Sequence, residues 1–157
     1  MDKATFLRRI NNNFLFQLFQ LWKLPAAWFM GLRVMYCDSR SCTVRLPYGW
    51  RSQNPFRSVY FAAQCAAAEM STGLLALAAL QDRPPVSMLI VKLEAEFIKK
   101  AAAPLLFTCD EGTLIETTIQ QAIDSGQNQT LRLCSAGRLP DGVEAARVWV
   151  TWSFKKK

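Results

Sequence analysis

The sequence contains no histidine, and this absence excludes several kinds of active site. Ser–His–Asp and Cys–His sites use an imidazole as their general base, and many metal centres use it as a ligand. Acid–base chemistry in this chain must therefore come from Asp, Glu, Lys, Tyr or Cys.

The cysteines lack a Cys-x-x-Cys pair, so no structural zinc site or other metal site is expected. Their odd number and apolar neighbours are typical of reduced thiols in the core of a cytoplasmic protein. An apolar run near the N-terminus resembles a signal peptide, but two glutamines and Lys23 interrupt it, and no cleavage motif follows. We therefore expect a cytoplasmic protein. The five cysteines are Cys37, Cys42, Cys65, Cys109 and Cys134.

Negative charge is scarce, because 12 Asp and Glu stand against 19 Lys and Arg and the net charge is +7. A basic surface attracts polyanions such as nucleic acid, anionic lipid or the phosphates of coenzyme A. The aromatic residues are not interleaved with basic ones as in RNA-binding modules, so nucleic acid is not expected. Hydrophobic residues make up 51% of the 157 residues, which predicts a single domain over residues 1–157.

An almost uncharged, alanine-rich stretch from Asn54 to Leu80 organises the chain. It predicts a long buried helix with Ser58 as its N-cap, ended by the segment Asp82–Pro85. The helix is long enough to cross a bilayer, but its polar residues argue against lipid exposure. Glu69 is its one carboxylate. A buried carboxylate is costly to ionise, so its presence requires a reason.

The segment Ala4–Lys23 has apolar residues at helical spacing and predicts one amphipathic helix. Pro25 ends it before a short second helix at Ala26–Met30. The first helix could dock on the domain or lie on a membrane or partner surface. Three asparagines, Asn11–Asn13, interrupt the basic face that lipid binding requires, so docking is favoured and membrane association is not expected.

Alternating apolar residues predict the strands. Two of them, Leu32–Tyr36 and Cys42–Leu46, form a hairpin before the long helix, and about four strands follow it. Glu111–Ser125 fits a helix as well as a strand, and we favour a helix. The pattern predicts an α+β fold in which an antiparallel sheet curls around one long helix. The later strands are predicted at Val86–Lys99, Leu105–Asp110, Leu131–Ala136 and Ala146–Phe154.

This order of elements resembles the hotdog fold, and the residues around the long helix resemble acyl-CoA thioesterases of the phenylacetate-degradation type. In that family an Asn precedes the helix and a His-Gly-Gly motif opens it. An acid follows about two turns later, and a Ser or Thr begins the next strand. Asn54, Glu69 and Ser87 match these positions, whereas Tyr60-Phe61-Ala62 replaces His-Gly-Gly. The resemblance covers residues 31–154, which makes residues 1–30 a helical lead-in to a hotdog core at 31–157.

The resemblance implies an acyl-CoA thioesterase with no cofactor, coenzyme A being part of the substrate. Glu69, with its pKa raised by burial, is the candidate general base or nucleophile. The free N–H groups of Phe61 and Ala62 are candidate donors to the oxyanion. Asn54 and Ser87 complete the predicted catalytic residues. The predicted substrate-binding residues are Arg51, Arg57, Tyr60 and Cys65, with the arginines near the coenzyme A phosphates.

The spacing of the predicted catalytic groups constrains the assembly. Phe61 and Glu69 lie eight residues apart, about 12 Å along a helix, whereas a reacting carbonyl must lie about 3 Å from both. Two antiparallel helices from two subunits meet this requirement. We therefore predict a homodimer with two shared sites, and pairing of dimers into a tetramer stays open.

Each candidate residue also has a structural interpretation. Glu69 could be a buried acid with satisfied hydrogen bonds, and Asn54 could only shape its loop. For the others the alternatives are core packing (Cys65), a turn (Ser87) and a solvated basic surface (the two arginines). Because the glycine pair is missing, the second candidate function is a catalytically weak protein that binds acyl-CoA or a fatty acyl chain. A basic membrane- or nucleic-acid-binding protein is the third.

Overall fold

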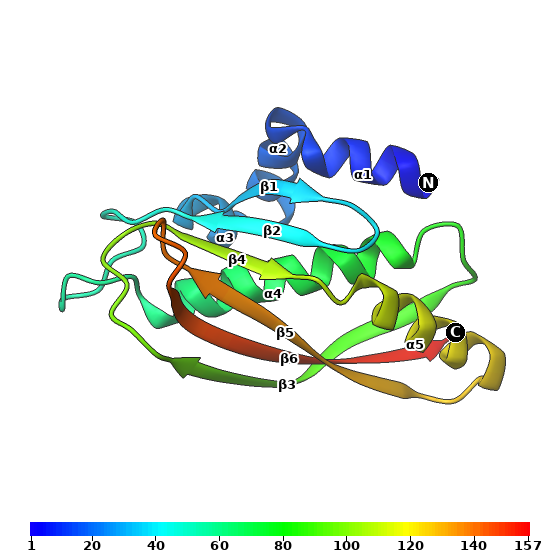
Figure 1. Cartoon of the computed structure of the whole chain (residues 1–157). Coiled ribbons are helices and arrows are strands. Elements are labelled where there is room, and N and C mark those ends of the chain that lie inside the picture. Colours follow the sequence, from blue (N-terminus) through cyan, green and yellow to red (C-terminus); the bar gives the residue numbers. More distant parts are fainter.

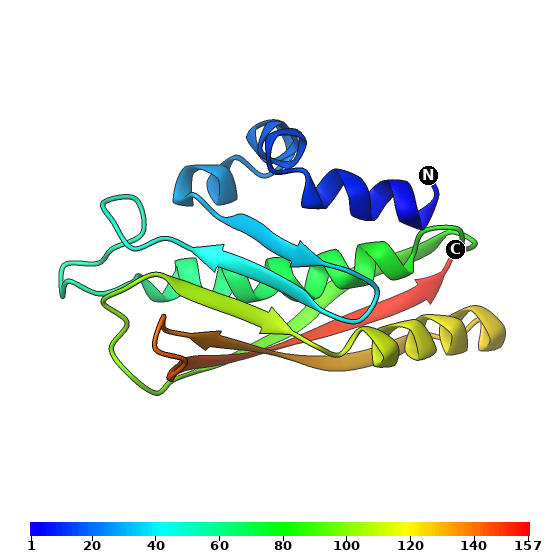
Figure 2. The same ribbon diagram turned by 45° about the horizontal axis from the view of Figure 1, so that its top comes forward.

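The framework of the protein is a six-stranded antiparallel sheet with the strand order β1-β2-β4-β5-β6-β3 (Figure 1). The computed structural model describes residues 1–157. The twisted sheet curves around one long helix, α4 (Figure 2). The strands are β1 (Arg33–Cys37), β2 (Cys42–Leu46), β3 (Val86–Phe97), β4 (Leu105–Cys109), β5 (Gln129–Arg138) and β6 (Glu144–Lys156).

Helix α4 (Phe61–Ala79) forms the centre of the core. Its alanines let the sheet approach closely, and fully buried side chains from the strands, such as Phe107 and Leu133, belong to the same apolar cluster. By length and hydropathy α4 could cross a membrane, but 67% of its apolar stretch is buried inside the protein, as in a core helix. The predicted α+β arrangement is therefore confirmed, as are the hairpin, the four later strands and a helix, α5 (Gly112–Ser125), in the ambiguous segment.

The predicted start of the long helix at Ser58 is wrong. Residues 54–58 form a tight turn in which the side-chain oxygen of Asn54 accepts hydrogen bonds from the Ser58 N–H (3.2 Å) and hydroxyl (3.1 Å). Arg57 adopts a left-handed backbone conformation there, with φ of 55°. The Ser58 hydroxyl is thus used in the turn, and α4 begins three residues later with Tyr60 as its N-cap.

The predicted single N-terminal helix is two helices, α1 (Lys3–Asn11) and α2 (Asn13–Lys23). They meet at Asn12, whose extended backbone breaks the helix and whose side chain caps α2 by accepting a hydrogen bond from the Leu15 N–H (3.1 Å). The side chain of Asn11 bonds the N–H and the carbonyl of Cys37 at 2.9 and 2.7 Å, which ties α1 to β1. The asparagine run therefore turns the chain.

Both N-terminal helices dock on the domain, the alternative that the sequence favoured. Ile10, Phe16 and Gln20 are buried, and Gln20 donates a hydrogen bond to the Met70 sulfur of α4 (3.5 Å). The predicted short helix follows as α3 (Pro25–Met30), and Gly31 ends it with φ of 76°.

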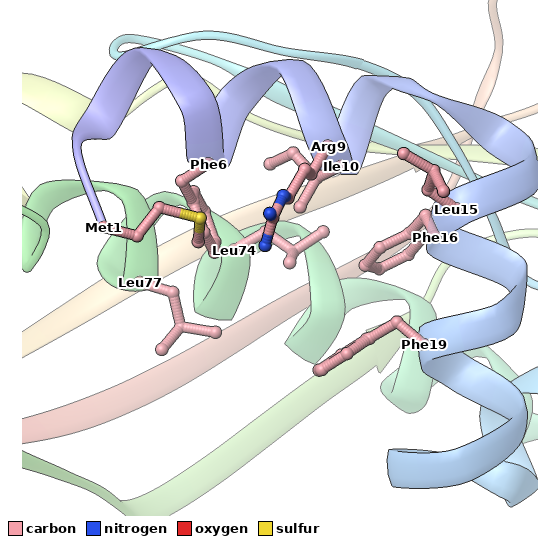
Figure 3. A pocket seen from close by; sticks show the side chains of 9 residues that line it. All are labelled: Met1, Phe6, Arg9, Ile10, Leu15, Phe16, Phe19, Leu74 and Leu77. Atoms are coloured by element: carbon pink, nitrogen blue, oxygen red, sulfur yellow. The ribbon is translucent and has the colours of Figure 1, made fainter.

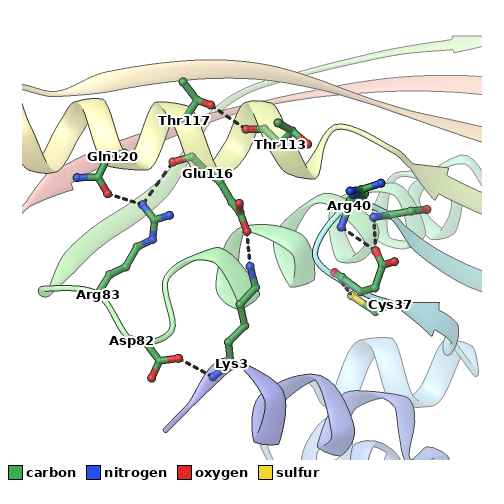
Figure 4. Close-up of polar contacts among 11 residues, drawn as sticks. Lys3, Cys37, Arg40, Asp82, Arg83, Thr113, Glu116, Thr117 and Gln120 are labelled. Atoms are coloured by element: carbon green, nitrogen blue, oxygen red, sulfur yellow. Dashed lines mark hydrogen bonds and ion pairs between the residues drawn. The ribbon is translucent and has the colours of Figure 1, made fainter.

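Polar contacts fasten the start of α1 to α5 and to the loop after α4 (Figure 4). The Lys3 ammonium pairs with Glu116 on α5, and the Lys3 N–H donates to the Asp82 carboxylate at 2.8 Å. From the same loop, Arg83 donates to the Gln120 side chain at 3.0 Å. These contacts hold α1 along the second half of α4.

Candidate active site

A hollow of about 270 Å³ lies at the start of α4, where this helix meets the end of β3. The rings of Phe61 and Phe97 pack edge to face there, with centroids 6.3 Å apart. Exposed Lys99 and Lys100 follow β3 and make the rim positive. The hollow is lined by Asn54, Ser58, Val59, Phe61, Gln64, Phe97, Ile98, Lys99, Lys100 and Ala101.

The first turn of α4 has free backbone donors at this hollow. Tyr60 supplies no side-chain cap, and the N–H groups of Phe61 and Ala62 make no hydrogen bond within the protomer. Unpaired amides at a helix N-terminus, aligned with the helix dipole, favour an anion or a developing oxyanion.

Asn54 lines the same hollow, but its carbonyl oxygen is already in use. That oxygen accepts hydrogen bonds from the Phe56 N–H and from Ser58 at 3.0 to 3.2 Å. The side-chain amide nitrogen has no hydrogen-bond partner in the protomer. Asn54 therefore shapes its loop and can still offer a donor to a bound molecule.

Gln64 and the lysine pair were not predicted as site residues. Gln64 is only 6% exposed and donates a hydrogen bond to the Val59 carbonyl at 3.2 Å. Its Oε1 is the one fully buried side-chain oxygen or nitrogen without a partner. The sequence signals were a polar side chain in the first turn of an alanine-rich helix and two adjacent cations after a strand.

Glu69 lies two turns into α4 and is half-buried. Its carboxylate makes no hydrogen bond or ion pair, and because it is not among the fully buried unpaired groups, it keeps contact with solvent. Burial alone raises the pKa of this carboxyl group above its usual value. The carboxylate lies against Gly73, because a Cβ atom at that glycine would be 3.1 Å from Glu69 Oε1.

The wall beside Gly73 is the indole ring of Trp152 from β6. A Cβ atom at Gly73 would lie 3.3 Å from this ring. The indole N–H donates to the Thr72 hydroxyl at 3.0 Å, and that hydroxyl donates to the Glu69 backbone carbonyl at 3.0 Å. The Glu69 carboxylate and the indole ring of Trp152 therefore both border Gly73.

Three of the predicted substrate-binding residues lie near the start of α4. The half-exposed ring of Tyr60 packs on that of Phe61, with centroids 4.9 Å apart. Arg57 is exposed on the turn that Asn54 holds. Cys65 is half-buried one turn before Glu69, and burial raises the pKa of its thiol, which disfavours the nucleophilic thiolate.

Two predicted residues lie elsewhere in the protomer. A guanidinium nitrogen of Arg51 lies 3.2 Å from the position of a Cβ at Gly31, and Arg51 lines a separate hollow over residues 47–52. Ser87 is exposed, and its hydroxyl donates to the Lys155 carbonyl at 3.1 Å. It lies ten residues before Phe97 on β3, about 33 Å along the strand. The protomer does not bring Ser87 to the hollow at the start of α4.

No group of three or more Cys, Asp or Glu residues is placed to hold a metal ion. Three of the five free cysteines, Cys37, Cys42 and Cys109, are buried, and the other two are half-buried. The candidate groups are thus backbone amides, amide side chains and lysines at the hollow, whereas Glu69 lies two turns further along α4 and does not line it.

Solved structures of bacterial proteins share this architecture. A Pseudomonas aeruginosa protein described as a probable thioesterase matches with a TM-score of 0.73 and 13% identity, covering 100% of this chain and 97% of that one. A putative thioesterase from Shewanella oneidensis matches with a TM-score of 0.75 and 9% identity, covering 98% of this chain and 99% of that one. A thioesterase from Haemophilus influenzae matches with a TM-score of 0.65 and 15% identity, covering 88% of each chain. These similarities confirm the predicted hotdog fold.

No protein of curated function has a sequence that matches the chain. Residues 13–152 match the family described as a domain of unknown function (DUF4442), which is most of the chain. The protein therefore belongs to this family and has the hotdog fold.

Proposed function

We propose that the protein hydrolyses acyl thioesters of coenzyme A, with Glu69 as the general base at a site shared by two subunits. The observation that carries the proposal is that both kinds of reactive group on α4 lack partners. The Glu69 carboxylate has no hydrogen bond, and the amides of Phe61 and Ala62 have none. Thioester hydrolysis requires such a base and such donors. The thioesterase descriptions of three fold neighbours support the same reaction class.

A homodimer brings these groups together. Helix α4 is continuous, so the amides and the carboxylate of one protomer lie about 12 Å apart along it. In an antiparallel pair of α4 helices, Glu69 of each subunit approaches the first turn of the other. The twofold axis of such a pair passes midway between Phe61 and Glu69, near Cys65.

Strand β3 offers the surface for this dimer. It is an edge strand that bonds only to β6, and its other edge is unpaired over twelve residues. Leu89, Val91 and Leu93 are 65%, 53% and 43% exposed. A long apolar edge recruits another strand, and pairing of β3 with its own copy would extend the sheet and place the two α4 helices side by side.

In this dimer Glu69 accepts a proton from a water molecule, and the hydroxide formed attacks the thioester carbonyl carbon. The amides of Phe61 and Ala62 from the other subunit bind the resulting oxyanion. When the intermediate collapses, the carbon–sulfur bond breaks and the thiolate of coenzyme A takes the proton from Glu69. The products are a carboxylic acid and free coenzyme A, and the carboxylate of Glu69 is restored.

The positive rim of the hollow supports coenzyme A as the thiol carrier. Lys99, Lys100 and Arg57 are exposed and have no ion pair in the protomer. Phosphate groups bound there would leave the pantetheine arm to enter the hollow. The unpaired Gln64 Oε1 could accept a hydrogen bond from an amide N–H of that arm.

The aromatic pair at the start of α4 favours the second candidate function, an acyl-CoA-binding protein that turns over weakly. Tyr60 and Phe61 are 45% and 55% exposed at the start of α4, and Phe61 replaces the first glycine of the family motif. Their rings leave the backbone donors in place but narrow the approach of the thioester.

The test is the release of free thiol from acyl-CoA by Glu69→Gln. We expect a loss of at least about 100-fold, because general-base catalysis contributes that much, with binding of acyl-CoA retained. Asp124→Asn, which removes an exposed carboxylate on α5, is the matched control and should keep full activity. Unchanged hydrolysis by Glu69→Gln would refute the role of Glu69, and binding without hydrolysis by the wild type would favour the binding protein.

The shared site also predicts proximity of two Cys65 thiols. A short bis-maleimide should join protomers of the wild type and of Cys134→Ser, but not of Cys65→Ser, on a denaturing gel. Cys134 is the other half-buried thiol and lies on β5, away from the predicted axis. A monomer by light scattering, or cross-linking that persists in Cys65→Ser, would contradict this dimer.

A further inference from the structure

A second cavity, of about 420 Å³, lies between the N-terminal helices α1 and α2 and the second half of α4 (Figure 3). Eight of its nine lining residues are hydrophobic. Arg9 is the exception, and it is exposed, so its methylene groups can line the wall while the charge stays in water. The lining residues are Met1, Phe6, Arg9, Ile10, Leu15, Phe16, Phe19, Leu74 and Leu77.

This cavity and Glu69 are arranged along the same helix. Leu74 and Leu77 line the cavity and follow Glu69 by five and eight residues on α4, about 7 and 12 Å along the axis. Gly73 lies between Glu69 and these leucines in the sequence, and the Glu69 carboxylate occupies the space that a side chain at Gly73 would need. Leu77 is 38% exposed although it lies in the core helix, so this side of α4 is not covered by the sheet.

We propose that this cavity receives the far end of the acyl chain, and that the substrates are straight-chain acyl thioesters of medium to long chain. The inference rests on the proposed function for the position of the thioester. From a carbonyl at Glu69, the path along α4 to Leu77 is the length of an extended chain of about ten carbons. The cavity itself has room for about fourteen groups of the size of a water molecule, which is close to that of a methylene.

The chemistry of the lining suits a flexible hydrocarbon chain. Apolar walls offer dispersion contacts and no hydrogen bond, so a polar or branched polar acyl group would lose its hydration without compensation. Each methylene that enters should strengthen binding by about fourfold, the equivalent of ~0.8 kcal/mol. The cavity therefore favours longer chains until it is full.

The test compares two tryptophan substitutions on α2. Leu15 lines the cavity and is 46% exposed, whereas Leu21 is 42% exposed and does not line it. The kcat/KM of the wild type for acyl-CoAs of four to sixteen carbons should rise with chain length. Leu15→Trp should lower the value for dodecanoyl-CoA at least tenfold and that for butanoyl-CoA less than twofold. Leu21→Trp should leave both unchanged.

A binding measurement separates this inference from the proposed reaction. Calorimetric titration of the Glu69→Gln protein should show tighter binding of dodecanoyl-CoA than of butanoyl-CoA, and adding Leu15→Trp should remove the difference. If the wild type releases no thiol but the binding difference is present and lost in Leu15→Trp, the cavity assignment stands and the hydrolase proposal fails. If hydrolysis and binding of dodecanoyl-CoA are unaffected by Leu15→Trp, the cavity assignment is overturned.

A second copy of the chain is the competing occupant, because the cavity lies beside the uncovered side of α4. In that case Leu15→Trp should weaken the dimer by light scattering and leave the dependence on chain length unchanged. That result would also overturn the assignment.

Discussion

The two hollows along α4 differ in chemistry although they adjoin the same helix. The one at the helix start has unpaired amides, Gln64 and two lysines, whereas the one beside its second half is almost entirely apolar. Glu69 lies between them. A molecule with an anionic head, a reactive centre and a hydrocarbon tail would match this sequence of environments, and an acyl-CoA has these three parts.

The two hollows are built from different parts of the chain. The polar hollow is made by the start of α4, its preceding turn and the end of β3, all parts of the hotdog core. The apolar cavity needs α1 and α2, which lie outside the sheet. In the proposed function, recognition of the head and of the tail would therefore depend on separate segments of the chain, which substitutions can address independently.

The largest effect on this comparison is expected from reversing the charge of the polar rim. Lys99→Glu combined with Lys100→Glu should lower kcat/KM for acyl-CoA about 100-fold at low ionic strength, and added salt should reduce the difference. Activity on an acyl thioester that lacks the nucleotide should stay within about twofold. Lys155→Glu with Lys156→Glu, the same charge change at the end of β6, is the control. An equal loss in the control would show that net charge alone is responsible.

A smaller effect is expected at the boundary between the hollows. Gly73→Ala places a methyl group 3.1 Å from Glu69 Oε1 and 3.3 Å from Trp152, so the carboxylate must shift. We expect kcat to fall about tenfold. The free energy of unfolding should change little, because the cost of the close contacts offsets the gain of about 1 kcal/mol in helix propensity from Gly to Ala. Steady-state kinetics and thermal unfolding measure the two quantities. Gly49→Ala, where nothing lies within 4 Å of the added Cβ, should change neither.

The smallest effect is a pH-dependent change in stability. Burial raises the pKa of Glu69 in the folded protein, so its ionisation destabilises the fold. The stabilising contribution of protonated Glu69 is complete below the unfolded pKa and is lost as pH rises through the folded pKa. Glu69→Gln should therefore be more stable than the wild type by about 1 kcal/mol at pH 8. The difference in unfolding free energy between the two proteins, measured with denaturant, should shrink as pH falls toward 4. A difference that does not change with pH would contradict a raised pKa for Glu69.

Most of the fold could be predicted from the sequence, because hydrophobic periodicity reports which residues face the core. The boundaries of the helices were less predictable where side chains bond to nearby backbone. Ser58 is a good N-cap by type, yet its hydroxyl is used by Asn54. The three asparagines were identified as an interruption of the helical face, but the change of direction at Asn12 depends on the bonds between Asn11 and Cys37, which are 26 residues apart.

The candidate site could be predicted where its residues are close in sequence. The structure places Asn54 and Phe61 at one hollow, as the spacing implied. The sequence did not identify the lysine pair, because tertiary contacts bring the end of β3 to the start of α4: the edge-to-face pair of Phe61 and Phe97, and the bond from the Val59 N–H to the Ala101 carbonyl at 2.8 Å. Ser87 was assigned from a motif position, and the length of β3 takes it to the opposite end of the strand from that hollow.

The attachment of α1 has a consequence for how proteins of this kind can diverge. Its first turn is held at the surface by Lys3, through Glu116 and Asp82, and not by the strands. The Asp82 contact is exposed and the Glu116 contact is partly buried, so substitution of these residues would loosen the first turn of α1 while Asn11 still ties its last turn to β1. Under the proposed function, substitutions in α1 could thus alter the accepted acyl tail without touching Glu69 or the start of α4.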